Sequence, residues 1–132
     1  MNSWKNWQQL NDMQIKPGND EQGVYAIRVS RKPDDWSSDI IYIGESLRLR
    51  NRLDNLRRAL QRLVDGEEFN AAELHVAAPK IKDRIFDKMD FPLKDIEISW
   101  IITLQNPDGV EKALLLAFYV STHSLPLLNE NF

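Results

Sequence analysis

The stretch GVYAIRVSRKPDDWSSDIIYIGES, Gly23–Ser46, contains two apolar runs joined by a polar loop. Both runs are rich in residues that favour strands, and the loop is too long for a tight hairpin turn. The sequence therefore predicts two antiparallel neighbouring strands. Gly23 lies two residues before Tyr25, and Gly44 lies two residues after Tyr42. Because glycine weakens a strand, we expect something to approach the backbone closely at both glycines.

The segment after this stretch is the clearest predicted helix in the chain. Ser46 is its expected N-cap, and Asp65–Glu68 marks its expected end. An apolar residue recurs about every 3.6 residues, which gives one continuous stripe on one side of the helix. The stripe consists of Leu49, Leu53, Leu56, Leu60, Leu63 and Val64.

Charge is concentrated on this predicted helix. Six arginines and one aspartate lie between Arg48 and Arg62, a local charge of +5 in a chain whose net charge is −3. An acidic chain argues against bulk electrostatic binding to DNA, but this one segment could still meet a polyanion. At 100° per residue, Arg52 lies at the edge of the apolar stripe, where it can lean over the sheet. Three others point toward solvent: Arg50, Arg57 and Arg58.

Three further elements follow from apolar spacing. Asp95–Leu104 alternates and predicts a third strand, and Val110–Val120 is apolar almost all round, which predicts a buried helix. Residues Ser3–Met13 predict a short N-terminal helix, because helical spacing places three residues on one face: Trp4, Trp7 and Leu10.

The order of these elements predicts an α/β fold, with a small three-stranded sheet, mixed or antiparallel, flanked by helices. At 132 residues, the chain is expected to form a single domain, 1–132, with a core at about 22–129. Residues 1–21 would be a helical extension and about 66–94 an insertion. Within the insertion Phe69–Met89 has no clear period, although its second half is expected to be helical.

The amino-acid composition excludes several kinds of functional site and bears on where the protein is found. The chain has no cysteine, which excludes disulfides, thiol nucleophiles and thiolate zinc sites. No run of residues approaches the roughly 20 apolar residues that span a bilayer, and the N-terminus lacks the apolar core of a signal peptide. The expectation is a cytoplasmic protein with no membrane partner.

Four residues could together carry out chemistry: Tyr25, Tyr42, Arg52 and Glu111. The set offers a group that can position or deprotonate water, a cation for transition-state charge and an oxygen ligand for a metal ion. Phosphodiester hydrolysis assisted by Mg²⁺ needs these parts.

Each of these residues also has a purely structural interpretation. Tyrosines are common in strand cores, and arginines on an amphipathic helix usually form its solvated face. Asp108 and Glu111 have the spacing of a capping box, so the glutamate could simply close the start of a helix. Composition and spacing therefore leave a nuclease as one possibility among several.

The motifs GVY at Gly23–Tyr25 and YIG at Tyr42–Gly44 resemble the signature of the GIY-YIG nuclease family. Ser46, Leu49, Arg52 and Leu53 after the second motif are similar to the family's next conserved segment. Further on, EKALLLAF and LPLLN, between Glu111 and Asn129, resemble its metal-binding glutamate helix and its closing segment. The resemblance covers most of the chain, with the motifs in the family's order, and implies a β-β-α-β-α arrangement.

This resemblance implies a divalent-metal-dependent endonuclease that hydrolyses DNA phosphodiester bonds. Tyr25 would position or deprotonate the attacking water, and Tyr42 would orient water or phosphate. Arg52 would neutralise charge on the transition state, and Glu111 would hold a single Mg²⁺ or Mn²⁺. Because an unperturbed phenol has a pKa of about 10, Tyr25 would need a nearby cation to act as a base.

The resemblance also implies that four residues contact the substrate: Gly44, Ser46, Arg48 and Asn129. The expected partner is DNA, including branched or flap structures, although the sequence does not separate DNA from RNA. A partner protein, or a homodimer formed through an exposed tryptophan-bearing N-terminus, could supply specificity.

The chain departs from the family pattern at two positions. Glu45 replaces a lysine found in many relatives, and Leu56 replaces a histidine or tyrosine. His75 is a candidate substitute for the missing base. These departures motivate an alternative function, in which the domain has lost turnover and acts as a DNA- or protein-binding module.

Overall fold

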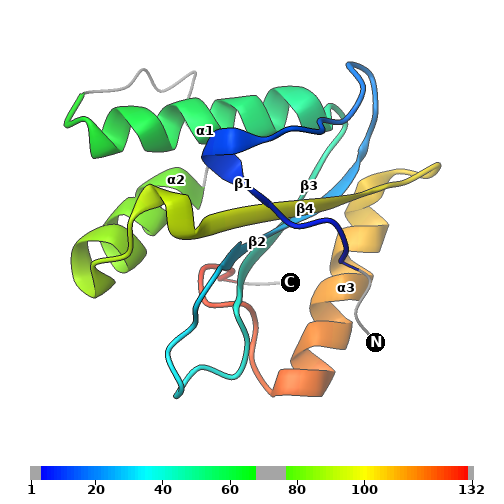
Figure 1. The fold of residues 1–132 in the computed structure, drawn as a ribbon. Coiled ribbons are helices and arrows are strands. Elements are labelled where there is room, and N and C mark those ends of the chain that lie inside the picture. Colours follow the sequence, from blue (N-terminus) through cyan, green and yellow to red (C-terminus); the bar gives the residue numbers. More distant parts are fainter. Residues whose placement is uncertain (1–3, 68–76, 131–132) are drawn as a thin grey trace.

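The computed structural model describes residues 4–67 and 77–130. Its sheet is antiparallel throughout and has the strand order β1-β4-β2-β3 (Figure 1). The described strands are β1 (Gln8–Gln9), β2 (Gly23–Val29), β3 (Ile40–Ser46) and β4 (Ile96–Ile102). The α/β class is thus confirmed. The sheet contains the three predicted strands and, in addition, the short strand β1.

Helices cover both faces of this sheet (Figure 1). The longer helices are α1 (Leu49–Val64) and α3 (Pro107–Thr122), and the shorter ones are α2 (Ala77–Ile81) and the π-helical turn η3 (Lys82–Asp87). Two 3₁₀ turns, η1 (Leu10–Asp12) and η4 (Leu93–Asp95), complete the described helices. Buried side chains of α1, α2 and η3 pack on one face of the sheet, and α3 packs on the other.

Helix α1 follows its predicted stripe closely. Leu49, Leu53, Leu56 and Leu60 are all buried, whereas Val64 at the end is 47% exposed. The predicted N-cap is wrong by two residues, because the helix begins at Leu49 and Arg48 occupies the cap position. The Ser46 hydroxyl accepts a hydrogen bond from the Arg48 backbone N–H at 3.0 Å, so the serine still orders the entry to the helix.

The N-terminal segment is not the predicted helix. Trp4 packs with the α3-side core and Leu10 with the α1-side core, and one helical face cannot reach both sides of a sheet. Instead, β1 pairs with the edge of β4, and η1 follows it. Trp4 is only 7% exposed, and the Trp7 ring lies under the Arg28 guanidinium at 4.3 Å. The expectation of an exposed tryptophan segment for dimer formation is therefore wrong.

Helix α3 differs from the predicted buried helix. It begins at Pro107, three residues earlier than expected, and only Pro107 and Leu115 are buried in it. Leu116, Tyr119 and Val120 are 54%, 45% and 67% exposed. Apolar composition alone therefore did not indicate burial, because only one side of this helix meets the sheet.

The remaining predictions concern the insertion and the membrane. Residues 82–87 form the π-helical turn η3, next to α2, as the helical reading of this part predicted. Much of Phe69–Met89, including His75, lies outside the described residues. Among the helices of residues 4–67 and 77–130, none has the length and apolar character that crossing a membrane requires.

Candidate active site

Strands β2 and β3 bring the two candidate tyrosines together. In their antiparallel register Tyr25 pairs with Gly44 and Ile27 with Tyr42, so both phenols lie on the α1 side of the sheet. The ring centroids are 6.2 Å apart, with the planes tilted by 41°. Tyr25 is fully buried and Tyr42 is partly exposed, so only Tyr42 presents a surface to a ligand.

The two glycines are explained by close contacts within the protein. A Cβ atom on Gly44 would lie 2.6 Å from both the Cζ and Oη atoms of Tyr25, so the phenol rests directly on the glycine. On Gly23 it would lie 2.0 Å from the Ile101 carbonyl oxygen of β4. Both distances are shorter than carbon contacts allow. The close approach predicted from the sequence is therefore made by a tyrosine ring and a neighbouring strand.

Arg52 reaches this pair from α1, as the helical spacing predicted. Its Nε atom donates a long hydrogen bond of 3.5 Å to the Tyr25 hydroxyl, and its side chain is partly buried. Because Tyr25 is held by the core, it fixes one side of the guanidinium. The rest of the guanidinium remains available to an anion, since arginine carries five N–H donors.

Glu111 is not the capping residue that its spacing suggested. The N-cap of α3 is Asn106, whose side-chain oxygen accepts the Asp108 backbone N–H at 2.9 Å. Because the helix begins at Pro107, Glu111 is its fifth residue and lies beyond the N-terminal N–H groups that a capping carboxylate serves. The capping interpretation is therefore wrong, and the partly buried carboxylate needs another explanation.

Electrostatic coupling links Glu111 to the other candidate residues. Burial raises the pKa of the Glu111 carboxyl, and the nearby carboxylates of Glu45 and Asp108 raise it further. Glu111 in turn contributes to a raised pKa at both Tyr25 and Tyr42. Because a charge shifts another group's pKa only over a short distance, Glu111 lies in the neighbourhood of the two phenols, and Arg52 joins them through its hydrogen bond to Tyr25.

The phenol pKa values shift away from what a general base requires. Burial raises the pKa of Tyr25 far above its ordinary range, and neighbouring Tyr42 raises it further, although Arg52 acts in the opposite direction. Burial also raises the pKa of Tyr42, where the Arg52 charge is the main opposing influence. Without an additional cation, both phenols are protonated at neutral pH and can serve as hydrogen-bond donors.

An open cleft of about 730 Å³ adjoins these residues. Arg52 lines it and so connects the cleft to the tyrosine pair. The cleft is lined by Glu45, Ser46, Leu47, Arg48, Arg52, Asn106 and Asp108. Two of the predicted substrate contacts, Ser46 and Arg48, thus face the same cleft as Arg52.

Two other residues that were predicted to contact the substrate instead contact other parts of the protein. Gly44 is buried beneath the Tyr25 ring. Asn129 uses its side-chain amide on β3, where Oδ1 accepts from the Ile43 N–H and Nδ2 donates to the Ile43 carbonyl, both at 2.9 Å. Asn129 therefore fastens the C-terminal tail to the sheet in the way a paired strand would.

Sequence reasoning missed two cleft residues at the start of α3. Asp108 was considered only as part of a capping box and Asn106 was not singled out, yet both line the cleft. The Asp108 carboxylate also forms an ion pair with Lys112 at 3.3 Å. Their proximity in sequence to Glu111 was the available signal. At Leu56, where the GIY-YIG pattern often has a histidine or tyrosine, the side chain is fully buried in the α1-side core and supplies no chemistry.

The donor set fits a magnesium or manganese ion held in part by substrate. Within residues 4–67 and 77–130, no three His, Asp or Glu side chains gather into a ligand group. Mg²⁺, however, commonly binds one or two carboxylates and completes its shell with water and phosphate oxygens. Glu111, with Glu45 close by, supplies that number of carboxylates.

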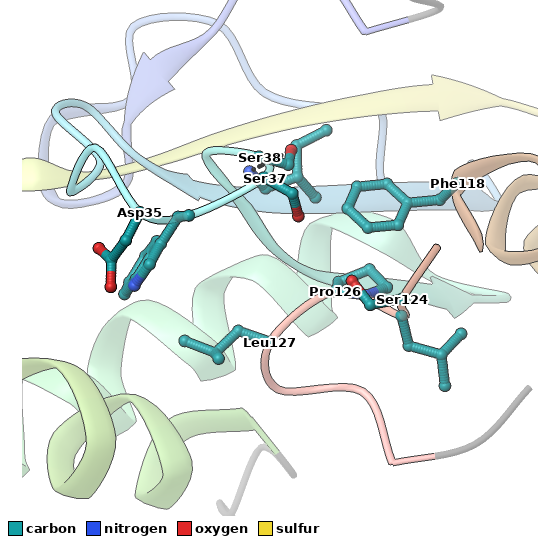
Figure 2. Close-up of a pocket in the computed structure, with 10 residues that line it drawn as sticks. Asp35, Ser37, Ser38, Phe118, Ser124, Pro126 and Leu127 are labelled. Carbon is teal, nitrogen blue, oxygen red and sulfur yellow. Dashed lines mark hydrogen bonds between the residues drawn. The ribbon is translucent and has the colours of Figure 1, made fainter. Parts of the chain in front are cut away.

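Another hollow, of about 200 Å³, lies at the opposite end of β3. Figure 2 shows it between the β2–β3 loop with Asp35, Phe118 of α3 and the C-terminal tail around Pro126. None of the four candidate side chains lines it. We therefore assign the candidate active site to the cleft at the Ser46 end of β3.

Comparison with known proteins adds no family assignment, since no family model, no curated protein and no solved structure matches this chain.

Proposed function

We propose that this protein is a divalent-metal-dependent endonuclease of the GIY-YIG type that hydrolyses DNA phosphodiester bonds. The observation that supports it is that Arg52, which lines an open cleft, bonds to Tyr25 beside Tyr42, and that Glu111 lies near enough to raise the pKa of both phenols. Tyr25, Tyr42 and Arg52 come from the consecutive elements β2, β3 and α1, and Glu111 comes from the more distant α3. Among the described elements, β2, β3, α1, β4 and α3 occur in the β-β-α-β-α order that the motifs imply, with β1 before them and α2 and η3 between α1 and β4.

In the proposed reaction, a water oxygen attacks phosphorus and the bond from phosphorus to the leaving oxygen breaks. Arg52 stabilises the negative charge that develops on the phosphoryl oxygens, because its guanidinium is fixed by Tyr25 and needs no reorganisation. Tyr42, the more accessible phenol, orients water or phosphate through its hydroxyl. The attacking water gives one proton to solvent in the open cleft, and the leaving oxygen takes one proton from solvent.

Glu111 is the proposed metal ligand, with Mg²⁺ or Mn²⁺ as a single ion. When bound, such an ion supplies Lewis-acid stabilisation of the leaving oxygen. The Glu111 carboxyl already has a raised pKa, because burial and the Glu45 and Asp108 carboxylates disfavour its charge. A cation at this position would relieve that repulsion and would also lower the pKa of the two phenols.

The test is cleavage of plasmid, flap and branched DNA by the full chain in Mg²⁺ or Mn²⁺. Glu111→Ala and Arg52→Ala should each reduce the rate by about 10² or more, the usual effect of removing one group that stabilises transition-state charge. Glu67→Ala and Arg50→Ala remove the same charges outside the site and should cleave at the wild-type rate. Absence of cleavage on every substrate with either metal would reject the proposal.

A second candidate function is a binding module without turnover. The full burial of Tyr25 favours it, because that phenol then has a structural role, and so does Leu56 in the core. This candidate predicts DNA binding that weakens with salt, no hydrolysis, and unchanged affinity in Glu111→Ala. Metal-dependent cleavage that is lost in the same variant would exclude it.

A further inference from the structure

Two groups of polar residues lie on different flanks of helix α1. Arg48 at its N-cap and Asn51, Asn55 and Arg58 within it recur at intervals of three and four residues, so they form one row along the helix. Arg50 and Arg57 lie about 180–200° around the axis from Arg48, on the other flank. The two groups therefore face different surroundings although they share one helix.

The row begins at the candidate active site. Arg48 lines the cleft together with Arg52, and both Arg48 and Arg58 are exposed. Arg58 is held in place by Asn55, whose Oδ1 accepts from its guanidinium at 2.6 Å. The row contains no acidic residue. Asp54, the aspartate of this helix, lies beside the row, four residues before Arg58, and pairs with Lys16 at 3.5 Å.

We propose that this row, Arg48–Asn51–Asn55–Arg58, binds the phosphate backbone of the DNA strand that leaves the cleft. This inference rests on the proposed function and adds to it the path of the substrate. A rise of 1.5 Å per residue gives the row a length of about 15 Å. One strand of B-form DNA carries a phosphate about every 3.4 Å along the axis, so the row spans about four phosphates.

The chemistry of the row suits phosphate. Arginine guanidinium groups bind phosphate through paired N–H donors, and asparagine amides donate to the same oxygens. The row reads no base edges, so binding along it is expected to be independent of sequence and strongly dependent on salt. The rest of the chain has a net negative charge once the Arg48–Arg62 segment is removed, so electrostatics favour binding of DNA at this segment over the remainder of the protein.

Fluorescence anisotropy with a labelled duplex of about 20 base pairs, over a range of salt and with Ca²⁺ in place of Mg²⁺, tests the proposal. The variant Arg48→Gln/Arg58→Gln should lower the slope of log K against log salt by about 1.8, since each lost contact removes about 0.9. The ratio of the wild-type affinity for DNA to the affinity of this variant should therefore fall about tenfold between 50 and 200 mM salt. The matched control Arg50→Gln/Arg57→Gln loses the same charge and should change the slope by less than about 0.5.

Equal slopes for these two variants, or no binding of wild-type protein at low salt, would overturn the proposal. Both variants must unfold at the wild-type temperature, and Asn51→Asp provides a second probe, since a carboxylate in the row should weaken binding. If the wild-type protein binds DNA through the row but cleaves no substrate, the hydrolytic function is refuted and the proposed DNA-binding row is supported. If the protein cleaves DNA but the two variants have equal salt slopes, the hydrolytic function is supported and the row is refuted.

Discussion

The two long helices have the same length and opposite relations to the core. Both α1 and α3 contain sixteen residues. The apolar residues of α1 form one stripe, and most of that stripe is buried. Helix α3 is apolar almost all round, yet only two of its residues are buried. The comparison shows that the burial of a helical residue depends on what lies opposite it, so a clear period is a better guide than apolar content.

The same comparison applies to the candidate site. Helix α1 supplies Arg52 and α3 supplies Glu111, from opposite faces of the sheet. Both groups lie toward the Ser46 end of β3, where Arg52, Glu45 and Ser46 line the cleft and the Glu45 carboxylate raises the pKa of the Glu111 carboxyl. The packed helix thus fixes the cation, and the less buried helix carries the proposed metal ligand.

The largest expected difference between the helices is in stability. Leu56→Ala should lower the free energy of unfolding by about 2–5 kcal/mol, because it removes a fully buried side chain and leaves a cavity. Leu116→Ala, on the exposed side of α3, should change it by less than about 0.5 kcal/mol. Urea unfolding of both variants measures this, and similar losses would show that the exposed face of α3 is covered in solution.

The second prediction concerns the two glycines Gly44 and Gly109. Gly44→Ala forces a methyl group against the buried Tyr25 ring and should destabilise the protein by about 1–3 kcal/mol. Gly109→Ala, in α3, meets nothing within 4 Å and should stabilise it by about 0.5–1 kcal/mol. Thermal unfolding of the two variants shows whether each substitution lowers or raises the stability of the protein. A neutral Gly44→Ala would mean that the tyrosine ring can move away from the strand.

A smaller effect is expected at the helix starts. Asn106→Ala removes the side-chain cap of α3 and should cost about 1 kcal/mol. Ser46→Ala, before α1, removes a hydrogen bond to the Arg48 N–H outside the helix and should cost less. If the two losses were equal, the Ser46 hydroxyl would be as important to α1 as a true cap.

The local spacing of apolar residues was sufficient to predict α1, β2, β3 and β4, because in each of them this spacing has a clear period and loop residues lie on both sides. The N-terminal segment was not predictable in this way. Trp4 and Leu10 fit a helical face, but they belong to cores on different sides of the sheet, and only the tertiary fold decides that. The same limit applies to Trp7, whose partner Arg28 is distant in the sequence.

The site was predicted in part. The proximity of Arg52 to Tyr25 followed from helical spacing. The start of α3 was misplaced, because Asn106 and Asp108 are both good caps and the choice between them determines the role of Glu111. Proline favours the first position of a helix, so Pro107 in the sequence indicated that the helix begins there and that Asn106 is its N-cap. The structural use of Asn129 on Ile43 could not be foreseen, since the two residues are far apart in the sequence.

The smallest predicted effect separates a metal ligand from a structural carboxylate at Glu111. Its pKa is raised in the folded state by burial and by Glu45 and Asp108, so folding favours the protonated form. The charged form therefore lowers stability at neutral pH, and this penalty disappears as the pH falls through the folded pKa. Glu111→Gln should raise the Tm at pH 7 by no more than about 3 °C, because the group is partly exposed, and the gain should vanish near pH 4.

At pH 7 without metal, Glu111→Gln is expected to be more stable than the wild-type protein, and divalent metal should make the wild-type protein the more stable of the two. If Mg²⁺ or Mn²⁺ binds the folded state at Glu111 and not the unfolded chain, it should raise the Tm of the wild-type protein in proportion to the logarithm of its concentration. The glutamine variant lacks the charged ligand and should not respond. Asp83→Asn, an exposed carboxylate on η3, is the control that should respond as wild type does. If Glu111→Gln responds to metal as the wild type does, the ion does not bind at α3, and the carboxylate has only an electrostatic role beside the two phenols.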